Sequence, residues 1–285
     1  MLPLKKIYID SRDRTVDSKS ASNFKIELPN TVQMPENTVF FVTDVCIPHV
    51  WYTIETDFND KLYMLYAYPP PSTPTTSRVQ PAVVILDEGN YTLTQLATHL
   101  QTKLNNALNT DAILVTTFIV TPNVSNNTLT ISMTGTNSYV WFNILTDAEV
   151  KTTPRSYWDG LDPGNPQSAN DILTRVSPMA NTTSYTTGFV NLNHINNVYI
   201  TSPNLGSFDT LATFSNNIIK KVPVTAGYGF MVVDQVMTTN DFLDCSRQTL
   251  RTLEFHLRDG RGREIDLKGM YVTFSLVFNK YTLEM

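Results

Sequence analysis

Short runs in which apolar and polar residues alternate are the main pattern in this sequence. Residues 24–28 and 253–258 alternate throughout, as does most of the run 272–278, and Pro29 ends the first run. Alternation with a period of two is typical of strands that pack one face on a core and turn the other to solvent. A glycine-supported turn at 259–263 separates the last two runs. These patterns predict antiparallel strands near both ends of the chain.

Two further runs, Val39–Ile47 and Lys61–Tyr68, are apolar on both faces. Such strands are covered on both sides, either by a second sheet or by a partner subunit. Both are candidates to lie near a subunit contact, although an interior position is favoured for Val39–Ile47. Four more strands are expected, at Ala82–Leu86, Val198–Thr201, Ile218–Val224 and Phe230–Val236.

One segment, at about residues 93–108, has the pattern of a helix. Thr92 and Gln95 have the spacing of a capping box. The apolar residues that follow recur on one helical face, and they are Leu93, Leu96, Ala97, Leu100, Leu104 and Leu108. With strands on either side, at Ile113–Thr121 and Leu129–Met133 downstream, this predicts a β-turn-α-β-β unit at about residues 82–134.

Two polar stretches are expected to form long loops, residues 69–77 and residues 151–188, because both are rich in proline. A parallel α/β sheet would need a helix between most strands, and the sequence has too few. The pattern therefore favours an all-β fold, an antiparallel β-sandwich with one helix.

Composition adds little that is specific. Charged residues make up 16% of the chain, against about 25% in ordinary soluble proteins, which suits packing against other subunits. The net charge of −5 argues against direct nucleic-acid binding, which needs clustered Lys and Arg. The densest basic run, 258–268, is interleaved with acidic residues and is interpreted as a solvated hairpin tip.

No signal-peptide core and no run near the ~20 apolar residues of a membrane span are present. We therefore expect synthesis in a reducing cytosol, where Cys46 and Cys245 stay unbridged. The same argument removes the Asn-x-Ser/Thr triplets as glycosylation sites. These triplets begin at Asn90, Asn123, Asn126 and Asn181.

The residues that carry chemistry do not form a recognisable site. His49, His99, His194 and His256 share no zinc-like spacing, and His99 and His256 are interpreted as surface residues. Cys46 is interpreted as a core residue. Asp10, Asp13 and Asp17 could suggest calcium, but the interleaved Arg12 and Arg14 favour ion pairs at a turn. We expect no catalytic, cofactor-binding or metal-binding residues, and hence not an enzyme.

Several stretches of ordinary strand and turn residues lie near the two ends of the chain. They are Ile7–Arg14, Asn23–Pro29, Asp44–Pro48, Trp51–Ile54, Leu253–Gly262 and Ile265–Gly269. By their order and placement, these stretches together resemble the penton, or minor capsid, proteins of Polintons, adintoviruses and virophages.

This resemblance implies a single jelly-roll core formed by residues 1–68 and 190–285, with residues 69–189 as an insertion. It also implies a homopentamer at the vertices of an icosahedral virion, next to capsomers of the major capsid protein. We further expect the segment before Asn23 to act as an arm that orders against a neighbour. The alternatives are another minor capsid or receptor-binding spike protein or, from a different class, a jelly-roll carbohydrate-binding protein.

Overall fold

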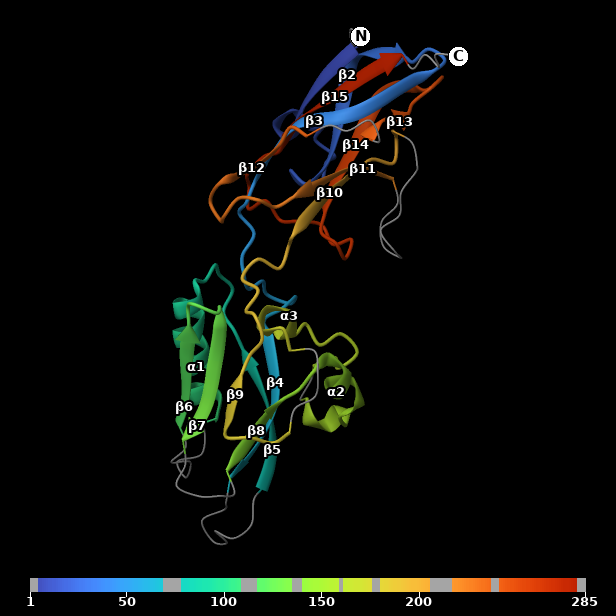
Figure 1. Ribbon diagram of the computed structural model, residues 1–285. Coiled ribbons are helices and arrows are strands. Elements are labelled where there is room, and N and C mark those ends of the chain that lie inside the picture. The colour runs from blue at the N-terminus through green and yellow to red at the C-terminus, as the bar shows by residue number, and fades with distance from the viewer. Residues whose placement is uncertain are drawn as a thin grey trace, which may run out of the picture. The chain divides into compact units, whose positions relative to one another are not determined.

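The chain divides into two compact units, which are both visible in Figure 1. Unit 1 comprises Met1–Trp51 and Ile195–Met285, and unit 2 comprises Tyr52–His194. The computed structural model describes residues 5–68, 78–108, 117–134, 140–158, 161–175, 180–205, 217–236 and 241–280. Over these residues the protein is mostly β-sheet, with antiparallel strand pairing in every sheet.

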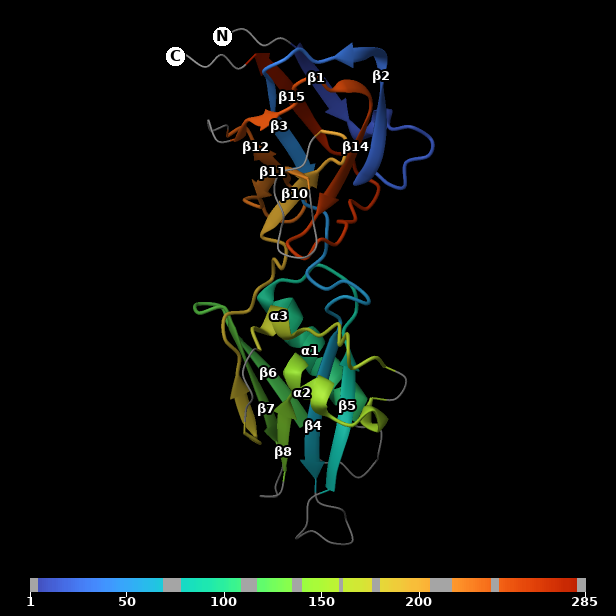
Figure 2. The ribbon, with the colours of Figure 1, turned by 90° about the vertical axis from the view of Figure 1, so that its right-hand side faces the viewer.

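Unit 1 is a jelly roll of two sheets. The first has the order β1-β15-β3-β12, with the short β13 also paired to β3, and the second has the order β11-β10-β14-β2. Figure 2 shows β1, β15 and β3 side by side. The strands are β1 (Lys5–Asp10), β2 (Asn23–Gln33), β3 (Thr38–Pro48), β10 (Asn197–Thr201), β11 (Ile218–Pro223), β12 (Met231–Asp234), β13 (Leu243–Asp244), β14 (Thr249–Arg258) and β15 (Thr273–Lys280).

The pairing in unit 1 is nested. The first strand, β1, pairs with the last strand, β15, and β2 pairs with β14. Further inside this order, β3 pairs with β12, and β10 and β11 form the innermost pair. Two sheets connected in this way are the topology of the eight-stranded jelly roll. The all-β jelly-roll expectation is thus confirmed, and its strands come from both ends of the chain.

The core of unit 1 lies between its two sheets. Phe24 on β2 stands opposite Phe255 on β14, with ring centroids 5.5 Å apart. Phe274 on β15, from the other sheet, meets Phe255 edge-on at 5.0 Å. All three rings are fully buried. The alternating runs at both ends of the sequence therefore supply the inward faces of both sheets.

The strand pairing of unit 1 is irregular at two places, one between β2 and β14 and one between β3 and β15. β2 continues past Pro29 to Gln33, so the expectation that Pro29 ends the strand was wrong. The register shifts between Leu250 and Thr252 on the facing strand, and a bulge is where a sheet tolerates proline. In β3, Asp44 has φ 55° beside a second register shift.

The N-terminal segment is ordered against its own chain. β1 pairs along its whole length with β15. The Ser11 amide then donates to the Val272 carbonyl, and the Thr15 amide donates to the Lys25 carbonyl. The expectation of an arm that orders on a neighbour was therefore wrong for residues 5–22, because β15 supplies the hydrogen-bond partners that an arm would seek elsewhere.

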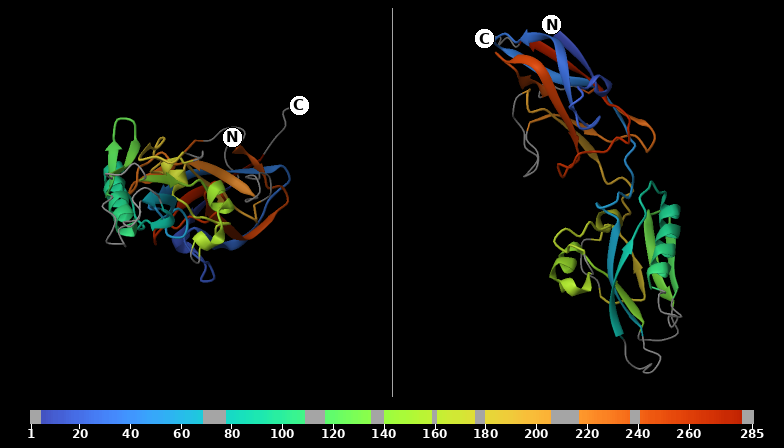
Figure 3. Two further views of the ribbon diagram at one scale, coloured as in Figure 1. Left: turned by 90° about the horizontal axis from the view of Figure 1, so that it is seen from below. Right: turned by 180° about the vertical axis from the view of Figure 1, so that it is seen from behind.

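Unit 2 contains two three-stranded sheets and the predicted helix. The sheet orders are β5-β4-β8 and β6-β7-β9. The helix α1 lies along β6 and β7 (Figure 3, right). The elements are β4 (Lys61–Tyr68), β5 (Arg78–Ile85), α1 (Leu93–Leu108), β6 (Thr117–Asn123), β7 (Thr128–Thr134), β8 (Trp141–Ile144), α2 (Asp147–Thr152), α3 (Asn170–Leu173) and β9 (Ser184–Thr186).

The helix begins and packs as the sequence predicts. The Gln95 amide donates to Thr92 Oγ1 (3.3 Å), and the Thr92 amide donates to Gln95 Oε1 (2.9 Å). Of the apolar face predicted for it, Leu93, Leu96, Leu100 and Leu104 are all buried. Beside this apolar face, the side chains of Gln101 and Asn105 accept hydrogen bonds from the β6 amides of Val120 and Phe118. The predicted β-turn-α-β-β unit is therefore present.

The boundary of the inserted unit differs from the expectation. The sequence analysis predicted that residues 61–68 belong to the jelly-roll core. These residues form β4, which is instead the central strand of a unit 2 sheet. Both of its faces are covered within unit 2: Leu62 and Met64 pack in one core, and Tyr63 packs with Trp158 in another. Residues 52–68 and 190–194 thus belong to unit 2, because a two-sided apolar strand does not reveal which sheet it joins.

Candidate functional site

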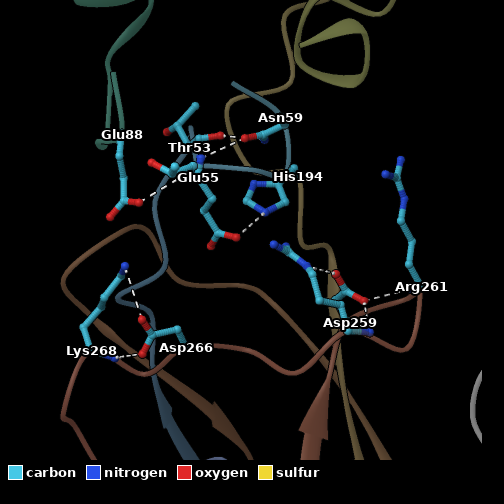
Figure 4. A network of polar contacts seen from close by, with 11 residues as sticks. Thr53, Glu55, Asn59, Glu88, His194, Asp259, Arg261, Asp266 and Lys268 are labelled. Carbon is cyan, nitrogen blue, oxygen red and sulfur yellow. Dashed lines mark hydrogen bonds and ion pairs between the residues drawn. The ribbon is translucent and has the colours of Figure 1, made fainter. Parts of the chain in front are cut away.

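The four histidines occupy separate environments. His49 stacks on Trp51 with ring centroids 4.3 Å apart, and its Nδ1 lies 2.8 Å from the Ala226 carbonyl oxygen. Burial lowers the pKa of His49, and the hydrogen bond to Ala226 opposes this only partly. His194 Nε2 lies 4.0 Å from Glu55 (Figure 4).

His99 and His256 are not the surface residues that the sequence suggested. His99 is half-buried, stacks near Tyr91, and accepts a hydrogen bond from the Asp87 amide at Nε2 (3.0 Å). Burial also lowers its pKa. His256 is half-buried beside two carboxylates, Glu254 at 3.2 Å and Glu264 at 3.7 Å. The helix and strand patterns placed both correctly on polar faces but did not show that neighbours cover those faces.

Both cysteines are free, as predicted. Cys245 is fully buried, and desolvation raises the pKa of its thiol to about 11. Cys46 is half-buried rather than a core residue, because its position in β3 alternates with the inward-facing Val45 and Ile47. It therefore belongs to the outer face of the first sheet.

The charged clusters pair internally. Arg12 forms an ion pair with Asp10 (2.5 Å), and Lys25 forms one with Asp17 (3.1 Å). In the basic hairpin, Asp259 accepts hydrogen bonds from the amides of Arg261 and Arg263, as part of the polar network in Figure 4. Lys268 pairs with Asp266 in the same network. The ion pairing expected at the first turn is present for Arg12 and Asp10, whereas Asp17 pairs with Lys25 on β2 instead.

Among the residues that the structure describes, no three His, Cys, Asp or Glu side chains gather as they would around a metal ion. Within the same described residues, no helix is long and apolar enough to span a membrane.

A cavity of about 370 Å³ lies on the outer face of the first jelly-roll sheet. It spans β1, β15 and the bulge in β3, with the exposed ring of Tyr8 on the edge strand. Its lining includes Tyr8, Asp10, Asp13, Asp44, Thr273 and Ser275. Sequence reasoning could not find this cavity, because strands from opposite ends of the chain form it.

An apolar strip lies at the other end of the same sheet, on β12 and the turn before it. Within residues 228–236, five large apolar side chains are 40–71% exposed. They are Tyr228, Phe230, Met231, Val233 and Val236. The predicted strand Phe230–Val236 contained most of this strip, but the sequence did not show that it forms the edge of a sheet.

Comparison with known proteins identifies the class of fold. No protein-family model matches the chain, and no curated protein matches it either. Among solved structures, 23 chains match. One is the crystal structure of the selenomethionine-labelled mavirus penton protein, with a TM-score of 0.53 and 10% sequence identity. The alignment covers 97% of this chain and 100% of the penton protein. The protein therefore has a penton-like jelly-roll fold.

Proposed function

We propose that this chain is the penton subunit of an icosahedral DNA virus, a structural capsid protein without enzymatic activity. Five copies would occupy each vertex of the virion, surrounded by capsomers of the major capsid protein. The observation that carries the proposal is the fold likeness to the mavirus penton protein over 97% of this chain. The likeness thus extends over both units, and not over a jelly roll alone.

The amino-acid sequence also supports the proposed penton function. The motifs that resemble pentons of Polintons, adintoviruses and virophages lie near the two chain ends. The structure brings the strands from these ends into neighbouring positions, since β1 pairs with β15 and β2 with β14. The acidic net charge of −5 disfavours a genome-coating role.

The proposal is tested by expressing this chain together with the major capsid protein of the same virus. Cryo-electron microscopy of the resulting particles should reveal five copies of the jelly roll at each vertex. Particles whose vertices are occupied by a different protein would contradict the proposal that this chain is the penton subunit. A matched preparation without this chain serves as the control and should have empty vertices.

The carbohydrate-binding alternative predicts a different result. The isolated chain would bind an immobilised glycan and would be absent from the vertices of co-expressed particles. Glycan-array binding by the purified chain, measured beside the particle experiment, separates the two functions.

A further inference from the structure

One ring nitrogen of His99, on α1, accepts a hydrogen bond from the main chain. The donor is the Asp87 amide, which lies 3.0 Å from His99 Nε2. A nitrogen that accepts such a bond must keep its lone pair, so Nε2 carries no proton and the neutral ring has its proton on Nδ1. This hydrogen bond therefore exists only while His99 is uncharged.

Three side chains together bind every polar group of Asp87, which lies in the connection between β5 and α1. His99 accepts from its amide, the Tyr91 hydroxyl donates to its carbonyl (2.9 Å), and Lys103 Nζ donates to its carboxylate (2.6 Å). His99 and Lys103 are one helical turn apart on α1. The rings of Tyr91 and His99 pack with centroids 5.0 Å apart. Asp87 is thus the point at which the connection is fixed to the helix.

The same connection holds the beginning of unit 2. Gly89 and Ile54 exchange two main-chain hydrogen bonds, each 3.0 Å long. Next to them, Thr53 Oγ1 donates to Asn90 Oδ1 (2.9 Å). Since Asp87 is only two residues from Gly89, we expect any loosening of Asp87 to reach the contacts between residues 89–90 and residues 53–54.

His99 is the member of this cluster that changes charge in mildly acidic solution. The charged groups that face its ring are Asp87 and Lys103, and Tyr91 is its other titratable neighbour. Burial is the main cause that lowers the pKa of His99, Asp87 opposes this effect, and Lys103 adds to it. The hydrogen bond from Lys103 lowers the pKa of the Asp87 carboxyl, and burial raises the pKa of Tyr91. Asp87 therefore stays ionised and Tyr91 stays neutral while His99 titrates.

Protonation of His99 removes the acceptor on which the Asp87 amide depends. The proton comes from solvent and adds to Nε2, which then points an N–H group at the amide N–H group. The nearest carboxylate oxygen for the new donor is Asp87 Oδ2, 3.9 Å away. Because the pKa of His99 is lowered in the folded state, the unfolded chain takes up this proton more readily. Unit 2 should therefore lose stability as the pH falls below about 6.5, the ordinary pKa of histidine.

We propose that His99 is an acid-sensitive latch on the connection between β5 and α1. The neutral ring fixes Asp87 on the helix. The protonated ring releases the Asp87 amide and loosens residues 87–91 together with their contacts to residues 53–54. The signal is the proton itself, so the latch needs no binding partner. All of its residues lie in unit 2, and the proposal does not rest on the penton function.

NMR spectroscopy of the full-length chain tests the latch. In slightly alkaline solution, long-range nitrogen–proton spectra should show His99 with its proton on Nδ1 and with Nε2 unprotonated. On acidification, the amide signals of Asp87 and Gly89 should shift with the same midpoint as the His99 ring. Hydrogen-exchange protection of the Asp87 amide, corrected for the intrinsic effect of pH, should fall by about two- to tenfold, as expected for the loss of one hydrogen bond.

A His99→Gln variant removes the charge change and keeps a side-chain acceptor, the amide oxygen of glutamine. In this variant the corrected protection of the Asp87 amide should no longer depend on pH. His256→Gln is the matched control, because His256 is a half-buried histidine of unit 1. The control variant should keep the pH response of Asp87 that the unmodified chain has.

Three results would overturn the latch. The first is a proton on Nε2 of His99 in alkaline solution, and the second is an Asp87 amide that does not respond when His99 titrates. Both are measured on the unmodified chain, so they decide the matter even if a variant fails to fold. The third is a pH response of Asp87 that persists in the His99→Gln variant, which would assign the response to another group. Absence of the chain from particle vertices would contradict the penton function and leave all of these measurements unchanged.

Discussion

Asp44 illustrates how one residue sets the geometry of a long strand. It lies inside β3 with φ 55°, where the register between β3 and β15 shifts. The residues before it face the core at Phe40 and Val42, and those after it at Val45 and Ile47. The extra residue of this bulge therefore keeps apolar side chains facing inward on both sides of it.

Asp44→Val should destabilise unit 1 by about 1–2 kcal/mol, because a β-branched residue is strained at positive φ. Asp44→Asn is the control, since asparagine tolerates this conformation and loses only the exposed ion pair with Lys6. Urea unfolding of both variants measures the difference. Equal midpoints for the two variants would show that φ at this position is unimportant.

The two thiols should differ in reactivity. Cys245 is buried and the pKa of its thiol is raised to about 11 by desolvation, so the reactive thiolate is scarce at neutral pH. Cys46 is half-buried on the outer face. In the native protein, iodoacetamide should therefore modify Cys46 much faster than Cys245, as measured by peptide mass spectrometry. In urea the two rates should converge, and a native Cys245 that reacts as fast as Cys46 would contradict its burial.

At the scale of elements, the sequence predicts well where one face of a segment is apolar. The helix expected at about 93–108 is α1, Leu93–Leu108, because six apolar positions recur on one face after a capping box. The hairpin β6–β7 was likewise expected. The short helix α2 was missed, although Thr146 and Glu149 form a capping box at its start. Six residues are too few for a clear period, and this capping pair was the available signal.

The sequence does not predict which strands pair when the partners are distant in sequence. β4 was correctly expected to be covered on both faces, but its partners β5 and β8 and the residue Trp158 come from the inserted unit. The cavity beside Tyr8 is likewise formed by strands from opposite chain ends. Periodicity reports which face of a strand is buried, and it does not report which strand lies beside it.

Leu100→Ala tests the packing of α1. Leu100 is 1% exposed within the main core of unit 2. The variant should lower the free energy of unfolding of unit 2 by roughly 2–5 kcal/mol through loss of apolar contacts and the cavity that remains. Asn106→Ala, at an exposed position of the same helix, is the control and should change stability little. A loss below about 1 kcal/mol would mean that the helix packs loosely.

At the scale of the whole molecule, the nested strand order explains how one chain accommodates a large insertion. Unit 2 enters between β3 and β10, at a connection between the two jelly-roll sheets. No strand pair of unit 1 is interrupted by it, because β1–β15, β2–β14, β3–β12 and β10–β11 all lie within unit 1. We expect folding to be slow, because pairs such as β1 and β15 join residues that are remote in sequence.

Each unit should therefore fold by itself. The main core of unit 1 draws on residues up to Trp51 and from Ile195 onward, whereas both cores of unit 2 lie within residues 52–194. A fragment of residues 52–194 should give a cooperative urea transition and a dispersed amide NMR spectrum. Residues 1–51 joined to 195–285 by a flexible linker should do the same. Leu100→Ala serves as the internal control, because it should shift the transition of the first fragment by the same free energy as in the full chain. A fragment that is unfolded in isolation while the full chain is stable would mean that its core depends on the other unit. Unit 2 would then be an insertion in the chain order but not an independently stable domain.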